Sequence, residues 1–202
     1  MTRRRGPQPD ATDVFMLNGA GWLVGARHCA SPNHDARPDP GTVSLIVIHA
    51  ISLPPGQFGG PGVEELFTNR LDPGVHPYYA DICALQVSAH FFIRRDGTVI
   101  QYVSAGERAW HAGVSCWKGR GQCNDFSIGI ELEGCDTQPF EAPQYEALAG
   151  LVRAIREHHP IEAVVGHSDI APGRKTDPGP FFDWARLQAM LDNEGLFAAR
   201  RG

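Results

Sequence analysis

Two stretches of the chain are almost entirely apolar and too short to be helices. Residues 43–49 read Val-Ser-Leu-Ile-Val-Ile-His, and residues 163–166 read Ala-Val-Val-Gly. Short runs of this kind, rich in β-branched residues, are typical of strands that are buried on both faces of a sheet. The pattern predicts two core strands, which end at His49 and His167.

A third stretch, residues 126–133, alternates between apolar and other side chains. Because a period of two places successive side chains on opposite faces of a strand, one face is predicted to be buried and the other to carry polar groups. The buried face would hold Ile128, Ile130 and Leu132, and the other face Gly129, Glu131 and Glu133.

A hairpin is predicted in the middle of the chain. The segments Val87–Arg95 and Thr98–Val103 have the composition of strands and flank the dipeptide Asp96-Gly97. Asp-Gly suits the positive φ angles at both central positions of a type I′ turn, so we expect that turn here.

Helices are predicted around these strands. Val63–Arg70 forms a short one, and a longer one begins near Pro143, whose fixed φ suits a first turn, and stops before Pro160. Asp183 can cap a last helix that runs to about Asn193. Because strands and helices are mixed and a hairpin lies between them, we expect an α/β fold with a mixed central β-sheet flanked by helices.

Length and composition place these elements in one domain. The chain has 202 residues, of which 42% are hydrophobic and 20% charged, close to the globular average. We expect a flexible N-terminal segment at residues 1–18 and a single domain at residues 19–202. A net charge of −5 without a long basic tract argues against a nucleic-acid partner. The longest aliphatic run, Leu45–Ile48, is far too short to span a membrane.

The N-terminus and the cysteines bear on the cellular compartment. Three arginines followed by the apolar residues 14–17 resemble a secretion signal, but acidic residues interrupt the apolar part and no cleavage site closes it. The five cysteines are odd in number and form no Cys-X-X-Cys pair, so we expect reduced thiols and a cytoplasmic protein. A disulfide between Cys116 and Cys123 is the alternative.

The candidate chemistry lies where the two core strands end. Open α/β sheets place their sites at the carboxyl edge, to which His49 and His167 are delivered. Asp177 precedes a proline and is biased toward an extended backbone, so Lys175 and Asp177 would project in the same direction. Two imidazoles and a carboxylate are a common catalytic zinc set that leaves a fourth position for water. Asp169, which closely follows His167, is a competing carboxylate.

A zinc site of this kind suits the hydrolysis of an amide. Zn²⁺ lowers the pKa of a bound water to about 7 and polarises a substrate carbonyl. Lys175 would stabilise the oxyanion of the tetrahedral intermediate, and a carboxylate must carry the proton from water to the leaving amine. Glu131 and Glu133 are both candidates for that carboxylate.

The segments around these residues carry further motifs, among them Arg-Ala-Trp-His-Ala-Gly at residues 108–113 and Arg-Lys-Thr-Asp-Pro-Gly-Pro at residues 174–180. In unbroken order over roughly residues 19–193, the chain resembles the zinc-dependent N-acetylmuramoyl-L-alanine amidases of the AmpD type. The motifs that carry the resemblance are residues 47–49, 52–59, 87–90, 94–97, 108–113, 123–134, 166–167 and 174–180.

The resemblance implies a fold, a cofactor and a set of site residues. The fold is the mixed sheet with flanking helices that these amidases share with peptidoglycan-recognition proteins. The implied Zn²⁺ ligands are His49, His167 and Asp177. Glu131 is implied as the catalytic carboxylate and Lys175 as the residue that stabilises the oxyanion.

The implied activity is cleavage of the amide between the lactyl group of 1,6-anhydro-N-acetylmuramic acid and the L-alanine of the stem peptide. It serves cytoplasmic recycling of bacterial cell-wall fragments, and in some bacteria it removes the fragments that induce β-lactamase. Asp169 would then be a loop residue. The family carries Asn directly after the first zinc histidine, where this chain has Ala50, and losing an outer partner of a ligand commonly costs about 10–100-fold in metal affinity or activity.

Substrate-binding residues are less sharply marked. Arg174 and Arg120 could clamp carboxylates of the stem peptide through paired hydrogen bonds, and Trp110 could line a sugar or peptide subsite. Solvated loop arginines and simple packing of the indole are the alternatives. The long Gly- and Pro-rich connection Phe58–Ala84 could close over the substrate.

Two other functions compete with the amidase. A non-catalytic muropeptide-binding module on the same fold would typically lack part of the ligand set, which here is complete. A purely structural zinc site would need four protein ligands, often cysteines, and the sequence offers no such set. We therefore expect a monomeric amidase that takes an anhydro-muropeptide as its substrate.

Overall fold

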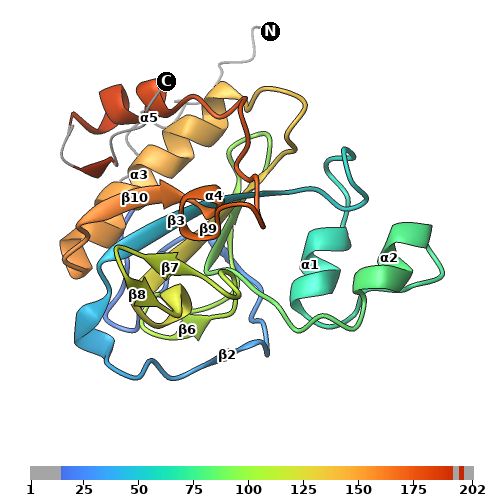
Figure 1. The fold of residues 1–202 in the computed structure, drawn as a ribbon, viewed down its shortest axis with the longest axis horizontal. Helices are drawn as coiled ribbons and strands as arrows, with labels where there is room; N and C mark the ends of the chain where they lie inside the picture. Colours follow the sequence, from blue (N-terminus) through green and yellow to red (C-terminus); the bar gives the residue numbers. More distant parts are fainter. Residues whose placement is uncertain (1–14, 193–195, 198–202) are drawn as a thin grey trace, which may run out of the picture.

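A mixed sheet forms the centre of the protein (Figure 1). The computed structural model describes residues 15–192 and 196–197. In order across the sheet, the strands are β1 (Arg27–His28), β5 (Val99–Gln101), β4 (Phe91–Ile93), β9 (Ser127–Glu133), β3 (Leu45–Ile51) and β10 (Ala163–Gly166). Strands β4, β9, β3 and β10 are parallel, whereas β5 pairs antiparallel with β4. The expected α/β class with a mixed sheet is confirmed.

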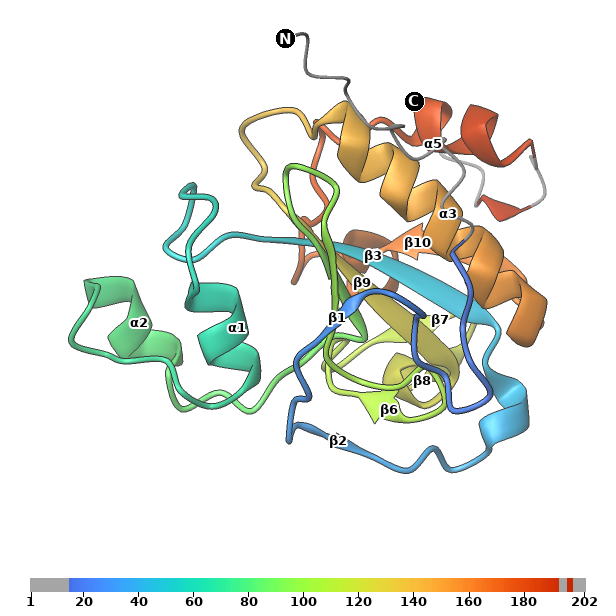
Figure 2. The ribbon, with the colours of Figure 1, turned by 180° about the vertical axis from the view of Figure 1, so that it is seen from behind.

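Helices and short strand pairs surround this sheet (Figure 2). The helices are α1 (Gly62–Phe67), α2 (Pro77–Ile82), α3 (Ala142–His158), α4 (His167–Ile170) and α5 (Trp184–Leu191), with 3-10 turns at η1 (Pro40–Thr42) and η2 (Cys123–Phe126). The short pairs are β2 (His34–Asp35) with β6 (Arg108–Ala109) and β7 (Cys116–Trp117) with β8 (Arg120–Gly121). Helices α3 and α5 lie on one face of the sheet, and α1 and α2 lie beyond the carboxyl end of β3 (Figure 1).

The two faces of the sheet have different neighbours, which follows from the alternation along its strands. Ile46 and Ile48 of β3 belong to the large core cluster that contains the apolar side of α3, whereas Leu45 and Val47 pack with η2 and α4. In β9 the predicted face of Ile128, Ile130 and Leu132 joins the same α3 cluster, as expected. The other face of both strands, which carries the candidate catalytic groups, is therefore turned away from α3.

The helix ends agree with the capping signals. Pro143 occupies the first turn of α3, and the Asp183 side chain caps α5 by accepting a hydrogen bond from the Arg186 N–H at 2.9 Å. Helix α5 ends at Leu191, and the predicted end near Asn193 lies outside the described residues.

The β4–β5 hairpin is confirmed, but the type I′ turn is wrong. Gly97 has a φ of +86°, whereas Asp96 is not among the residues with positive φ. The Asp96 carboxylate instead accepts a hydrogen bond from the Thr98 N–H at 2.9 Å, which holds the turn in a different form. Glycine is needed at 97 for a second reason, because a Cβ there would meet the backbone oxygen of Pro143 at 2.9 Å.

The N-terminal segment and the five cysteines were also subjects of prediction from the sequence. Of the N-terminal segment expected to be flexible, residues 1–14 lie outside the described residues, and Leu17 is 3% exposed within the core. The structure describes all five cysteines, and each is a free thiol, so the alternative bridge between Cys116 and Cys123 is not formed. Within residues 15–192 and 196–197, no helix has both the length and the apolar character needed to cross a membrane.

The buried Gln101 ties the N-terminal segment to the sheet, which makes a test of this packing possible. Its Oε1 accepts from the Leu23 N–H at 2.6 Å, and its Nε2 donates to the carbonyls of Gly21 at 2.8 Å and Val103 at 3.0 Å. Gln101→Leu would leave these buried groups unpaired, so the free energy of unfolding in urea should fall by about 2–4 kcal/mol. Gln57→Leu, at an exposed position, should change it by less than about 0.5 kcal/mol.

Candidate metal centre and active-site pocket

His49, His167 and Glu131 lie at the same level of the sheet because the strands that carry or precede them are parallel and in register. Gly166 of β10 is in register with Ile48 of β3, and His49 of β3 is in register with Glu131 of β9. His167, which follows Gly166, therefore lies level with His49 and Glu131 across adjacent strands. Neighbouring strands are about 4.8 Å apart, so groups that share a level and a face can act together.

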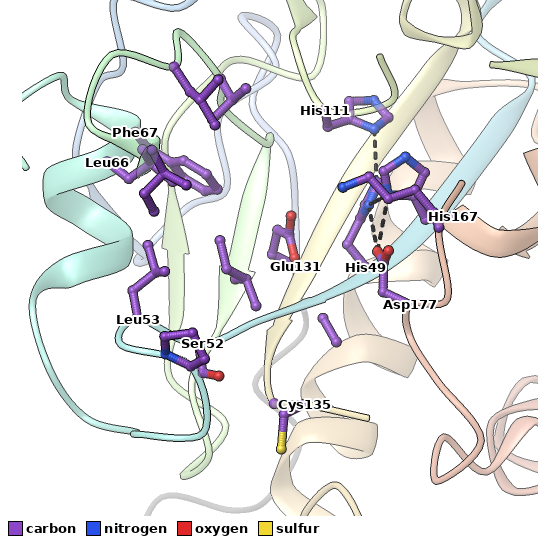
Figure 3. Close-up of a pocket in the computed structure, with 18 of the residues that line it drawn as sticks. His49, Ser52, Leu53, Leu66, Phe67, His111, Glu131, Cys135, His167 and Asp177 are labelled. Carbon is purple, nitrogen blue, oxygen red and sulfur yellow. Dashed lines mark hydrogen bonds and ion pairs between the residues drawn. The ribbon is translucent and has the colours of Figure 1, made fainter. Parts of the chain in front are cut away.

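The third member of the cluster arrives on the loop that follows α4. The Ser168 N–H donates to the carbonyl of Asp177 at 3.0 Å, which holds this loop against the helix. Oδ2 of Asp177 then lies 3.2 Å from Nδ1 of His49 and 3.1 Å from Nδ1 of His167 (Figure 3). The two Nδ1 atoms are themselves 3.0 Å apart. The structure thus brings together the ligand set that the sequence suggested.

The donor set fits a metal ion. A tetrahedral Zn²⁺ with bonds of about 2.0–2.1 Å separates its ligand atoms by about 3.3 Å, close to the separations found here. Nε2 of His167 lies 3.1 Å from the Ala112 carbonyl, which can only accept, so Nε2 carries a proton; in the neutral imidazole the lone pair is then on Nδ1, which faces the cluster. Burial lowers the pKa of His49 to about 4, so this imidazole is neutral at pH 7. Neutral imidazole nitrogens beside a carboxylate oxygen are the ligand atoms that zinc takes.

Asp169 does not belong to the cluster. Its Oδ2 accepts a hydrogen bond from the Gly166 N–H at 2.7 Å and so caps the amino end of α4. The Asp169 carboxylate therefore bonds the backbone at the start of α4, the helix that begins at His167, instead of joining the metal cluster.

The cluster forms one end of a pocket of about 490 Å³. The metal-site residues make that end polar, whereas the remainder is lined chiefly by apolar side chains that come from the segment around α1 and α2 (Figure 3). These apolar lining residues include Leu53, Leu66, Phe67, Ile82, Leu85 and Val87. A molecule with one reactive polar end and a larger body fits such a pocket.

Glu131 faces this pocket without a partner. Its Oε2 is buried and has no hydrogen-bond partner among the described residues. Burial, with the nearby Asp177 charge, raises the pKa of Glu131 well above its ordinary value, and Lys175 opposes the shift. A carboxyl group that is desolvated and unbonded beside a cluster of ligands is suited to accepting and releasing a proton.

Glu133, the alternative to Glu131, has a structural role. It is 3% exposed, and its carboxylate accepts hydrogen bonds from the N–H groups of Gly59 at 2.6 Å and Arg95 at 3.1 Å. Glu131 and Glu133 lie on the face of β9 that is turned away from α3. Glu133 is two residues further along the strand, where it accepts a hydrogen bond from the loop before α1. The structure favours Glu131 for the catalytic position.

The remaining candidates fall into two groups. Lys175 lines the pocket together with Asp177, and Trp110 lines it while its Nε1–H donates to Asp35 Oδ1 at 3.2 Å. Neither of the two arginines is among the pocket residues, because each is engaged elsewhere.

Arg174 and Arg120 each contact another part of the protein. Nη2 of Arg174 donates to the carbonyls of Ala112 at 2.8 Å and Val114 at 2.6 Å, and so braces the segment that supplies the partner of His167. The guanidinium of Arg120 lies 3.9 Å from the centre of the Phe126 ring, a cation–π contact outside the pocket.

One residue that contacts the cluster was not identified as such from the sequence. Nδ1 of His111 lies 2.9 Å from Nε2 of His49, and His111 also lines the pocket. The neighbouring Trp110 was predicted to line a substrate subsite, but nothing in the local pattern of residues 108–113 shows that this loop reaches His49. Ala50 lines the pocket beside His49. The ring nitrogen of His49 that faces away from the cluster contacts His111, and that of His167 contacts the Ala112 carbonyl. Neither imidazole therefore depends on position 50 for its hydrogen-bond partner.

A ligand cluster lies at the carboxyl edge of a mixed sheet, beside a glutamate whose Oε2 has no hydrogen-bond partner in the described part of the chain. Such a site is suited to metal-assisted hydrolysis. The family model described as N-acetylmuramoyl-L-alanine amidase matches residues 39–180. The chain belongs to this family of hydrolytic enzymes, and the resemblance to its AmpD-type members is confirmed.

Similar proteins support both the family and the fold. The chain is 56% identical over 181 residues to the 1,6-anhydro-N-acetylmuramyl-L-alanine amidase AmpD of Escherichia coli strain K12, covering 89% of this chain and 99% of that one. A crystal structure of a selenomethionine AmpD derivative superposes with a TM-score of 0.85 at 56% identity, covering 87% of this chain and 99% of that one. The Drosophila peptidoglycan recognition protein SA shares the fold, with a TM-score of 0.52 at 15% identity, covering 84% of this chain and 86% of that one.

The state of Glu131 gives a stability prediction. Because its pKa is raised in the folded protein, its stabilising contribution is present below the unfolded pKa of about 4.3 and is lost as the pH rises through the folded value. Glu131→Gln should therefore increase the free energy of unfolding of metal-free protein at pH 7 by about 1–3 kcal/mol. The gain should vanish at pH 4, as measured by urea denaturation. Glu146→Gln, at an exposed position on α3, should show no such pH-dependent gain.

Proposed function

We propose that this protein is a zinc-dependent amidase that cleaves the amide between 1,6-anhydro-N-acetylmuramic acid and the L-alanine of a stem peptide. The observation that carries the proposal is the convergence of His49, His167 and Asp177 at the polar end of the pocket, with Glu131 beside them. The similarity to amidases named for the 1,6-anhydro substrate supports the choice of substrate.

The metal we propose is zinc, held by the Nδ1 atoms of the two histidines and by Oδ2 of Asp177. The close separations of these atoms and the neutral state of His49 support this choice. Zinc at this position supplies Lewis acidity, which acidifies water and polarises the substrate carbonyl.

The residues of the chain then divide the work of amide hydrolysis. Glu131, with a raised pKa and an unbonded oxygen, takes the proton from the attacking water and passes it to the leaving amine of L-alanine. The amine must leave protonated, because an amide anion is a poor leaving group. Lys175, at the pocket wall, stabilises the negative charge that develops on the carbonyl oxygen.

The rest of the pocket binds the body of the substrate. Trp110 and the apolar wall near α1 and α2 offer a surface for the sugar ring or the stem peptide, and the indole is held by its hydrogen bond to Asp35. We propose that Arg174 and Arg120 bind carboxylates of the stem peptide where it extends beyond the pocket. Arg174 also braces residues 112–114 through two backbone carbonyls, and Arg120 lies over the Phe126 ring.

We further place the protein in the bacterial cytoplasm, as a monomer that takes part in the recycling of cell-wall fragments. Five free thiols are the support for a reducing compartment. No nucleic acid or membrane partner is part of this proposal.

The proposed activity predicts the release of free stem peptide. Anhydro-muramyl tripeptide and its non-anhydro counterpart should be incubated side by side with the protein, and the products identified by mass spectrometry. Cleavage at the lactyl amide should be lost after treatment with a chelator and restored by added Zn²⁺. Saturable binding with no product after long incubation would instead establish a muropeptide-binding module, and undiminished turnover of metal-stripped protein would exclude the metal mechanism.

The identity of the carboxylate ligand gives a matched pair of variants. Asp177→Asn replaces a charged ligand oxygen with an amide and should weaken zinc binding by at least about 100-fold, with a parallel loss of turnover. Asp169→Asn keeps an oxygen that can cap the Gly166 N–H and should leave zinc affinity within about threefold of the parent. Competition with a fluorescent chelator measures both. A larger loss in the Asp169 variant than in the Asp177 variant would reverse the assignment.

A further inference from the structure

A series of hydrogen bonds links the backbone at Cys123 to the metal cluster through Ser127 and His111. We infer that His111 is a positioning residue that holds His49 in the tautomer able to bind the metal through Nδ1. The inference rests on the proposed metal site, but it is independent of the substrate and of Glu131.

The series of hydrogen bonds begins at the backbone carbonyl of Cys123, which can only accept a hydrogen bond. Oγ of Ser127 lies 2.6 Å from the carbonyl oxygen of Cys123 and donates its single proton there. The same Oγ lies 3.2 Å from Nε2 of His111, so in that contact it must be the acceptor and His111 the donor. A neutral imidazole carries one N–H, and therefore Nδ1 of His111 bears a lone pair.

The next contact transfers this constraint to the metal ligand. Nδ1 of His111 lies 2.9 Å from Nε2 of His49, so Nε2 of His49 must carry the proton and donate it. The lone pair of His49 is then on Nδ1, the atom that lies 3.2 Å from Oδ2 of Asp177 and 3.0 Å from Nδ1 of His167. Each contact in the chain has one consistent donor, from the backbone of Cys123 to the metal cluster.

The position of the His111 ring is fixed independently of this chain. The backbone N–H groups of His111 and Ala112 donate to Oδ1 of Asn124 at 3.1 and 2.8 Å. Beneath the ring lies Gly129 of β9, where any Cβ would collide with the imidazole. The ring meets that of His49 edge to face, with the centroids 5.0 Å apart. The acceptor atom is thus in place before a metal arrives.

Removal of the acceptor would open a competing arrangement. Without a partner for Nε2, His49 could place its proton on Nδ1 and donate it to Asp177 Oδ2, which lies 3.2 Å away. That hydrogen bond would occupy the lone pair and the oxygen that a metal needs, so the metal would have to displace a proton. Loss of such outer partners commonly costs about 10–100-fold in metal affinity.

The experiment uses full-length protein stripped of metal, with two readouts besides activity. Zinc dissociation constants are measured by chelator competition for the parent, His111→Phe, Ser127→Ala and His111→Gln. The tautomer of His49 in the metal-free protein is read from long-range ¹H–¹⁵N spectra of the imidazoles. The matched control is His28→Phe: Nε2 of His28 lies 2.9 Å from the backbone carbonyl of Leu23, and His28 belongs to β1, which three strands of the sheet separate from β3.

The expected result is an increase of about 10–100-fold in the zinc dissociation constant of His111→Phe, with the proton of His49 moved toward Nδ1. Ser127→Ala keeps both rings and should show a smaller loss in the same direction, so it carries the test if His111→Phe fails to fold. His111→Gln, whose amide oxygen can accept, should recover part of the affinity, and His28→Phe should match the parent.

Two outcomes would overturn specific parts of the account. If the parent binds zinc and both His111→Phe and Ser127→Ala bind it within about twofold of the parent, with the His49 tautomer unchanged, His111 has no positioning role. If the parent itself binds no zinc, the proposed function fails, whatever the His111 variants show.

Discussion

The site depends on the close approach of three atoms that repel one another when none of them carries a proton. Two imidazole nitrogens and a carboxylate oxygen meet with separations of 3.0–3.2 Å at the carboxyl edge of the sheet. Lone pairs and a negative charge held this close repel one another, and burial strengthens the repulsion because water screens it poorly. A divalent ion between them would turn the same arrangement into coordination. The fold must therefore supply enough rigidity to hold the ligands together before the ion arrives.

That rigidity comes from elements that serve several ligands at once. The parallel pairing of β10, β3 and β9 sets the level of His167, His49 and Glu131, and the core under α3 keeps these strands in register. Helix α4 links the strand end at His167 to the loop that carries Asp177. The loop at residues 110–113 supplies partners for both imidazoles and is itself held by Arg174 and Asn124. Ligand geometry and loop geometry are thus parts of one hydrogen-bonded unit.

The sequence predicted the parts whose signal is local or lies in strand periodicity. Short apolar runs marked β3 and β10, and alternation marked β9 and its buried face, because both patterns reflect burial directly. His49 and His167 were predicted as ligands because they lie at strand ends. Asp177 and Asp169 were both candidates for the third ligand, and the resemblance favoured Asp177. These predictions needed no knowledge of how distant loops fold.

The parts that escaped prediction depend on contacts between distant segments. The contact of His111 with His49 arises because residues 110–113 fold over Gly129 of β9, which no local pattern encodes. Arg174 stays a predicted substrate-binding residue, and its hydrogen bonds to two backbone carbonyls of another loop could not be read from the sequence. The hairpin turn differed because the Asp96 side chain bonds its own turn. In each case a polar side chain bonds a group that the local sequence pattern does not reveal.

The central claim is that two imidazole nitrogens and one carboxylate oxygen hold a single divalent ion with a position left for water. X-ray absorption spectroscopy of protein loaded with one equivalent of Zn²⁺ tests this coordination most directly. The account predicts only nitrogen and oxygen neighbours at about 2.0–2.1 Å, with scattering from two imidazole rings. A sulfur neighbour at about 2.3 Å, contributed by any of the free cysteines, or scattering from more than two imidazoles would contradict it.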